Sequence, residues 1–206
     1  MVERKRYHHG DLPQALRTAT LAILSEFGVD GFTLREAARR VGVNHRAVYR
    51  HFEDKRALLA DISEEGYRGL AAAMRAALAE HPADEIETRL VVICQGYLRF
   101  ARKEPARYQV MFGPRLNTDG RFVELEKAIS DALLVVREEL RRAGPTASSL
   151  ARRDAGITLW SAIHGLTSLV LTGKVPLAER HLARYVETIM RPVAHGVAET
   201  LATASA

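Results

Sequence analysis

Cysteine is nearly absent from this chain of 206 residues, which contains only Cys94. A single thiol excludes both an internal disulfide framework and a cysteine-rich zinc site. The opening segment MVERKRYHHG also lacks the apolar core that a secretory signal requires. We therefore expect a reducing, cytoplasmic setting for this chain, whose 47% of apolar residues are enough for a substantial buried core.

Signatures of catalysis and cofactor binding are missing as well. The chain has no G-x-S-x-G, no G-x-G-x-x-G, no Walker loop and no H-E-x-x-H. His8 and His9 are adjacent but lack a third ligand at a useful spacing, and Cys94 lies on an apolar stripe, where a packed thiol is expected. These absences predict a protein that is not an enzyme and that holds no metal and no cofactor.

One segment, residues 155–173, carries no charged side chain and approaches the length of a membrane span, which is roughly 20 residues. Polar side chains interrupt this segment, among them Thr158, Ser161, His164 and Thr167. Apolar, small and aromatic residues each occupy one face of the expected helix. We therefore predict a helix buried in protein on all sides, and no membrane span.

Positive charge is concentrated at the start of the chain. The net charge is +5, and residues 1–56 hold 11 Lys and Arg against 7 Asp and Glu, with four of the eight His. A basic segment joined to a nearly neutral remainder is typical of polyanion binding, because phosphate neutralisation uses such an excess. A basic surface that only confers solubility explains the charge equally well.

Helical periodicity runs through the whole chain, since apolar residues recur every three or four positions. No segment alternates apolar and polar residues for long enough to predict a strand, so the pattern predicts an all-α fold. The expected helices cover residues 12–27, 33–41, 44–52, 54–81, 83–103, 119–143, 148–172 and 178–203, with a short helix beginning near residue 105.

Several of these helices have recognisable ends. Thr33-Leu-Arg-Glu36 is a capping box, in which the Thr hydroxyl and the Glu carboxylate satisfy free amides of the first turn. Gly42 is placed to end that helix, and Asn44 and Asp54 can cap the next two helices.

Residues 33–52 meet the packing requirements of a helix-turn-helix. Two short helices at a tight turn need a small residue where they approach, a glycine where the chain reverses and an aliphatic residue where the second helix sits on the first. Ala38, Gly42 and Val48 supply these in order. The second helix then presents side chains suited to bases or phosphates, namely His45, Arg46, Tyr49 and Arg50.

An ordinary pair of surface helices also explains exposed Arg and His side chains. The alternative function is therefore a helical adaptor or structural bundle without specific DNA binding. The combination of basic segment, capping box and Ala-Gly-Val spacing favours the helix-turn-helix. Salt-dependent binding to duplex DNA separates the two functions.

The segment TLREAARRVGVNHRAVYRHFEDKRALL resembles the N-terminal domain of the TetR family of transcriptional regulators. The likeness lies in its T-x-R-x-x-A helix start, its G-V-x-x-x-x-x-Y-x-H-F recognition helix and the D-K-x-x-L-L that opens the next helix. The opening YHHGDL and the later WSAIHG resemble the subgroup named for a W-H-G signature. The resemblance implies a DNA-binding domain at residues 1–54 and a helical ligand-binding and dimerisation domain at residues 55–206.

The resemblance also implies which side chains contact double-stranded DNA. Thr33 and Arg35 would lie near the DNA backbone at a helix start, and His45 and Arg46 would face bases. Tyr49, His51 and Lys55 would contact phosphates, while the target of Arg50 stays open. The set is Thr33, Arg35, His45, Arg46, Tyr49, Arg50, His51 and Lys55.

Three basic residues precede the first helix: Arg4, Lys5 and Arg6. A basic arm of this kind can lie in an adjacent minor groove. A solvated tail is an equally good interpretation.

The remaining residues would form a homodimer and bind a small-molecule effector, so that we expect a repressor that leaves a palindromic operator when the effector binds. In the family the last two helices pair with those of a second copy; intrachain packing is the alternative for the same apolar residues. The expected pocket residues are Tyr97, Tyr108, Met111, Phe112, Trp160 and His164. Aromatic and Met residues at helical spacing are also typical of an ordinary core.

Overall fold

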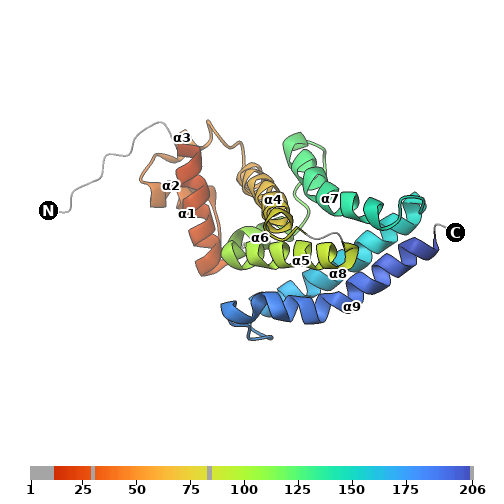
Figure 1. Cartoon of the computed structure of the whole chain (residues 1–206). Coiled ribbons are helices and arrows are strands. Elements are labelled where there is room, and N and C mark those ends of the chain that lie inside the picture. The colour runs from red at the N-terminus through yellow and green to blue at the C-terminus, as the bar shows by residue number, and fades with distance from the viewer. Residues whose placement is uncertain (1–11, 29–30, 83–84, 205–206) are drawn as a thin grey trace. The chain divides into compact units, whose positions relative to one another are not determined.

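The computed structural model describes residues 12–28, 31–82 and 85–204 (Figure 1). These residues form helices, and no strand occurs among them. The predicted all-α fold is confirmed. The elements are α1 (Leu12–Phe27), α2 (Leu34–Val41), α3 (His45–Val48), α4 (Lys55–Glu80), α5 (Ile86–Lys103), α6 (Pro105–Met111), α7 (Val123–Ala143), α8 (Ser149–Leu171), the 3-10 helix η1 (Glu179–His181) and α9 (Leu182–Thr203).

The chain divides into two compact units. Unit 1 contains residues 1–63 and 106–122, and unit 2 contains residues 64–105 and 123–206. Helix α4 begins in unit 1 and continues in unit 2. The predicted boundary between a DNA-binding and a ligand-binding domain after residue 54 stays a prediction.

A cluster of buried side chains forms a core of unit 1. Leu16 of α1 and Phe32, which precedes α2, are fully buried, and burying a side chain of this size stabilises the fold by roughly 1.5–3 kcal/mol. Helix α6 adds Ala106 and Val110 to the same cluster. A segment far along the sequence therefore packs into the core that the first three helices form with the start of α4.

The predicted side-chain caps from Thr33, Asn44 and Asp54 are confirmed. The hydroxyl of Thr33 accepts a hydrogen bond of 3.1 Å from the amide three residues on, and the Asn44 carboxamide accepts one of 2.9 Å from the amide two residues on. The Asp54 carboxylate accepts one of 2.7 Å from the amide of Ala57. Each cap satisfies an amide that the first turn of a helix leaves without a partner.

Helix α3 is shorter than the sequence predicted. It ends at Val48, and residues 49–51 continue as a turn. The amides of His51 and Phe52 both donate to the Val48 carbonyl, each at 2.9 Å. This tight turn still brings Phe52 into the core, where its side chain is buried as predicted.

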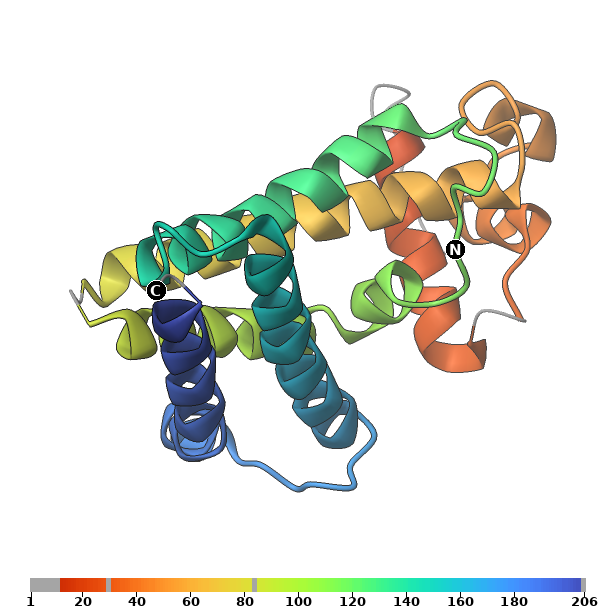
Figure 2. The same ribbon diagram turned by 90° about the vertical axis from the view of Figure 1, so that its right-hand side faces the viewer.

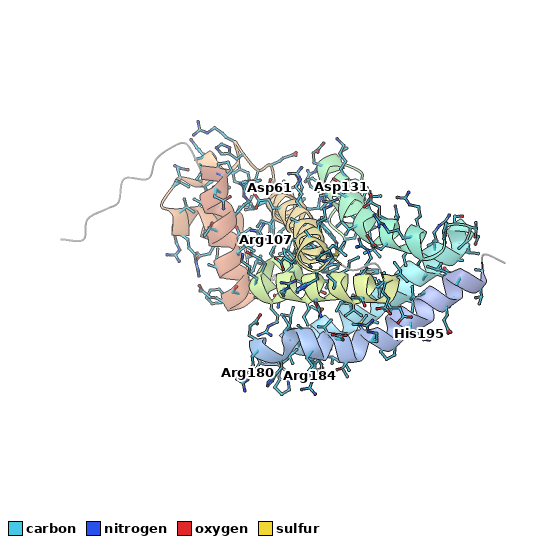
Figure 3. The ribbon with its side chains drawn as sticks, viewed as in Figure 1. Asp61, Arg107, Asp131, Arg180, Arg184 and His195 are labelled. Atoms are coloured by element: carbon cyan, nitrogen blue, oxygen red, sulfur yellow. The ribbon has the colours of Figure 1, made fainter. Side chains whose placement is uncertain are left out.

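Helix α5 is the centre of unit 2 and packs against α7, α8 and α9 (Figure 1). The half-buried guanidinium of Arg89 donates to both carboxylate oxygens of the buried Glu139 on α7, at 2.6 and 2.8 Å. A Cβ atom at Gly96 would lie 2.8 Å from the carbonyl oxygen of Ala73, so glycine allows the close approach of α4 and α5. Helices α8 and α9 lie side by side and run in opposite directions (Figure 2).

The expectation that helix α8 is buried on all sides is wrong for the single chain. Its buried residues form one face, which includes Leu159, Ile163 and Leu166. Ile157 and Trp160 are exposed. The reason is that α5, α7 and α9 cover only part of its circumference. Among the described residues, no helix combines the length and the apolar character that crossing a bilayer requires.

Candidate nucleic-acid interface

The turn between α2 and α3 is built as the sequence predicted. Ala38 and Val48, the two residues expected at the helix contact, are buried. Gly42 adopts φ +76°, the left-handed region that favours glycine, and ends α2. Its amide and that of Val43 donate to the last carbonyls of α2, at 3.2 and 3.0 Å. The turn therefore sets the direction of α3 relative to α2.

The outer side of α3 and of the turn after it is polar and exposed. Val48 and Phe52 face the core and Ala47 is half-buried against it, while His45, Arg46, Tyr49, Arg50 and His51 are exposed. The rings of His45 and Tyr49 meet edge to face, with centroids 6.4 Å apart. The predicted DNA-contacting residues that the structure brings together on this side are His45, Arg46, Tyr49, Arg50 and His51.

Two further predicted contacts lie at the helix starts that flank this surface. Thr33 uses its hydroxyl as the N-cap of α2, and Arg35 in the first turn is exposed. Lys55 begins α4, with its Nζ atom 5.4 Å from the centre of the Phe32 ring. The predicted arm residues Arg4, Lys5 and Arg6 lie outside the described residues.

A surface hollow of about 550 Å³ lies next to α3. Arg50 and His51 line it together with the first residue of α1, Leu12. Its remaining lining residues are Gly42, Val43, Asn44 and Ala47. The hollow therefore brings the start of α1 next to two predicted DNA-contacting residues.

An ion-pair network that the sequence analysis missed joins α1 to α2. Arg40 donates to both carboxylate oxygens of Glu26, at 2.7 and 2.6 Å, and its Nε donates to Glu36 at 3.2 Å. Hydrogen bonds from Arg39 and from Arg40 lower the pKa of Glu36 to about 2. Glu36 therefore departs from the capping-box expectation, because its carboxylate binds two guanidinium groups. The spacing of four between Glu36 and Arg40 was a signal for part of this network.

Three of the expected pocket residues come together in unit 2. The hydroxyl of Tyr97 on α5 lies 3.2 Å from Nδ1 of His164 on α8, and the rings of Trp160 and His164 are 5.8 Å apart. Burial lowers the pKa of His164. Tyr67 of α4 is a neighbour that the sequence analysis missed, and burial, with Tyr97 and Glu126, raises its pKa to about 12.

The other three expected pocket residues belong to unit 1. Tyr108 and Met111 are buried on α6, and the ring of Phe112 lies 4.6 Å from that of Tyr108. The predicted set is therefore divided between the two units. Cys94 is buried in unit 2, and burial raises the pKa of its thiol to about 12, which fits the packed thiol that its position predicted.

A helix-turn-helix whose second helix exposes basic and aromatic side chains is the arrangement by which many proteins enter the major groove of DNA. Residues 16–62 match the family model described as bacterial regulatory proteins, tetR family. Residues 90–193 match the model of the tetracyclin repressor-like C-terminal domain. The chain belongs to the TetR family and is a DNA-binding transcriptional regulator of the helix-turn-helix type. Membership argues against the alternative of a helical adaptor without specific DNA binding.

Individual relatives agree with this assignment. The tetracycline repressor protein class A from transposon 1721 of Escherichia coli is 48% identical over 52 residues, which are 25% of this chain and 24% of the relative. The match thus spans about a quarter of the relative's length. A solved protein of unknown function from Rhodococcus sp. RHA1 has a TM-score of 0.76 at 25% identity, covering 94% of this chain and 99% of its own.

A second solved structure is a tetR-family regulatory protein, also from Rhodococcus RHA1. It has a TM-score of 0.65 at 21% identity and covers 88% of this chain and 96% of its own. At that identity the likeness concerns the fold. Because it extends over most of both chains, it supports the all-helical architecture outside the helix-turn-helix.

Proposed function

We propose that this regulator is a repressor that binds an inverted-repeat operator as a homodimer and leaves it when a small molecule binds. The observation that carries the proposal is the exposed polar side of α3 and of the turn after it, which the buried side chains of Val48 and Phe52 hold against the core. A surface of this kind reads bases when a helix enters the major groove.

Within this proposal the side chains divide into two roles. His45 and Arg46, at the start of α3, face base edges. Tyr49, His51 and Lys55 contact phosphates, and Thr33 and Arg35 lie near the backbone at the start of α2; Arg50 is assigned to DNA contact without a fixed target. Arg4, Lys5 and Arg6 are further residues that we assign to DNA contact. This division follows the resemblance to the TetR family, and in general phosphate contacts position a protein on DNA while base contacts read the sequence.

Selection of bound fragments from a pool of genomic DNA tests the operator part of the proposal. The recovered sequences should share a short inverted repeat, because two DNA-binding domains related by a two-fold axis read two half-sites. Affinity for that repeat should fall steeply as salt rises, and it should exceed the affinity for a scrambled duplex. Equal affinity for both duplexes at every salt concentration would contradict the proposal.

The proposed homodimer uses the exposed sides of α8 and α9. Gly165 of α8 and Gly196 of α9 have open space where a side chain would stand, and Ile189 of α9 is exposed. Small residues on a helix surface allow a second helix to approach closely, and burying exposed apolar side chains favours association.

A size series at Gly196 tests this dimer. Gly196→Ala should leave the oligomeric state unchanged, since one methyl group fits a close helix contact. Gly196→Arg should convert the protein to monomers in a sedimentation experiment while its helical circular dichroism is kept, because arginine favours a helix more than glycine does. A Gly196→Arg protein that remains dimeric would place the interface elsewhere.

The proposed effector site is centred on Tyr97 and His164, with Trp160 at its edge. Apolar walls with a few polar groups are the usual composition of such a site. Helix α4 carries residues of both units. A ligand that binds more tightly to one position of α4 would therefore change the spacing of the two DNA-binding domains of the dimer.

Trp160 is the only tryptophan in the chain, so its fluorescence reports binding near it. A compound that quenches this fluorescence in a small-molecule screen should also release DNA from the wild-type protein. Trp160→Leu should impair that release and leave operator affinity nearly unchanged, and Tyr97→Phe, which removes one hydroxyl, should weaken the response less. If the Trp160→Leu protein releases DNA normally when the compound binds, the pocket lies elsewhere. If it fails to dimerise, Trp160 belongs to the dimer interface.

A further inference from the structure

The loop of residues 112–122, which connects α6 and α7, is tied to the residues where α4 begins. Its last arginine, Arg121, donates from Nη2 to both carboxylate oxygens of Asp54, at 3.0 and 2.8 Å. Its Nη1 atom donates to Glu53 at 3.0 Å. One guanidinium of the loop therefore binds the two adjacent carboxylates that lie between the helix-turn-helix and α4.

A second ion pair runs in parallel with the first and has its charges reversed. Arg56 of α4 donates to the carboxylate of Asp119 in the loop. The guanidinium groups of Arg56 and Arg121 lie 5.4 and 4.5 Å from the centre of the Phe122 ring. Two oppositely oriented pairs fix the loop in one register, because a shift would bring like charges together.

The loop is also held by its own bonds. The buried side chain of Asn117 accepts a hydrogen bond of 2.9 Å from the amide of Phe122 and donates one of 3.2 Å to the carbonyl of the same residue. Arg121 therefore projects from a segment with a defined shape. Planar guanidinium groups lose less freedom in binding two oxygens when their backbone is already fixed.

Asp54 has a structural task at the same place, since it caps the first turn of α4. Burial raises its pKa, but hydrogen bonds from Arg121 and from the Ala57 amide outweigh burial and hold the pKa below its ordinary value. Asp54 is therefore a charged group at neutral pH. Glu53 beside it is 79% exposed and faces solvent with most of its surface.

These two carboxylates directly precede Lys55, to which the proposed function assigns a phosphate contact. Negative side chains this close to a phosphate repel it, and the repulsion is stronger where they are not neutralised. We propose that Arg121 is a positioning residue for DNA binding: it holds the first turn of α4 in place and offsets part of the negative charge of Glu53 and Asp54 beside Lys55. The inference rests on the proposed function in one respect, the location of Lys55 at the DNA.

The experiment compares operator affinity for the wild type, Arg121→Ala and Arg115→Ala. Arg115 is an exposed arginine of the same loop, so its removal changes the net charge equally. Arg121→Ala should weaken binding about tenfold at low salt, a change of about 1.4 kcal/mol, and Arg115→Ala should weaken it much less. The deficit of Arg121→Ala should shrink as salt rises, because exposed charges are screened.

Rescue separates neutralisation from simple loss of structure. Glu53→Gln removes a charge that is 79% exposed and paired with Arg121, so it should change wild-type affinity little. In the Arg121→Ala background the same substitution should restore a large part of the affinity. Arg121→Gln, which keeps hydrogen bonding without the charge, should behave like Arg121→Ala and serves as the test if the alanine variant unfolds.

The outcomes are distinct. Equal affinities of Arg121→Ala and Arg115→Ala would overturn the role of Arg121 while leaving the proposed function intact. A deficit that neither salt nor Glu53→Gln reduces would also overturn it, because a merely structural loss behaves in that way. If the wild type selects no duplex at all, the proposed function fails first and the inference fails with it.

Discussion

The buried ion pair between Arg89 and Glu139 supports a quantitative prediction about unit 2. The Glu139 side chain is 5% exposed and that of Arg89 is 17% exposed. Removing one partner of a buried pair leaves the other charge without compensation, which costs about 3–5 kcal/mol. Because Arg89 retains some access to water, we expect Glu139→Ala to lower the free energy of unfolding by about 3 kcal/mol, the lower end of that range.

The assay is denaturation followed by circular dichroism at constant protein concentration, since dimerisation shifts apparent stability. A loss of about 3 kcal/mol corresponds to a fall in Tm of roughly 6–12 °C for a chain of this size. Arg142→Ala is the matched control, because Arg142 is 67% exposed and lies 3.8 Å from the same carboxylate, so its removal should change stability by less than about 0.5 kcal/mol. The double variant Arg89→Met/Glu139→Leu should recover most of the loss. A Glu139→Ala protein within about 1 kcal/mol of the wild type would refute the reasoning.

Two further predictions concern unit 1. Gly42→Ala should destabilise the protein by about 1–2 kcal/mol through backbone strain alone, since no atom lies within 4 Å of the added Cβ. Thermal denaturation measures this loss of stability, and an unchanged Tm would contradict the prediction. Glu36 has a pKa lowered from 4.5 to about 2 by Arg39 and Arg40, so its ionised form stabilises the fold above pH 4.5 and this contribution is lost as pH falls towards 2. Glu36→Gln should therefore make the free energy of unfolding fall less steeply as pH is lowered from 4.5. The same pH dependence as in the wild type would argue against the network.

Local signals explain why the helix-turn-helix was predictable from the sequence. The caps at Thr33, Asn44 and Asp54 each involve an amide two or three residues away, so residue type and spacing determine them. Gly42 ends α2 because the left-handed conformation favours glycine. Interactions of this range do not depend on how the rest of the chain folds.

Interactions between distant segments were not predictable in the same way. Arg121 and Asp54 are 67 residues apart, and nothing in either neighbourhood indicates the other. The burial of α8 was overestimated because an apolar helix face indicates that other residues pack on it, but does not indicate whether these residues belong to the same chain or to another. The expected pocket residues Tyr97 and Tyr108 share a residue type, and only the packing of the helices assigns them to different units.

The base preference of Arg46→Ala tests the central claim most directly, which is that the exposed side of α3 reads DNA sequence. Affinities for duplexes with every single substitution in the selected half-site should show that Arg46→Ala loses discrimination at one position, worth about 1–3 kcal/mol there. Lys55→Ala, which removes the phosphate partner proposed above, should weaken binding to all these duplexes nearly equally. An Arg46→Ala protein that keeps the full wild-type preference would contradict the account.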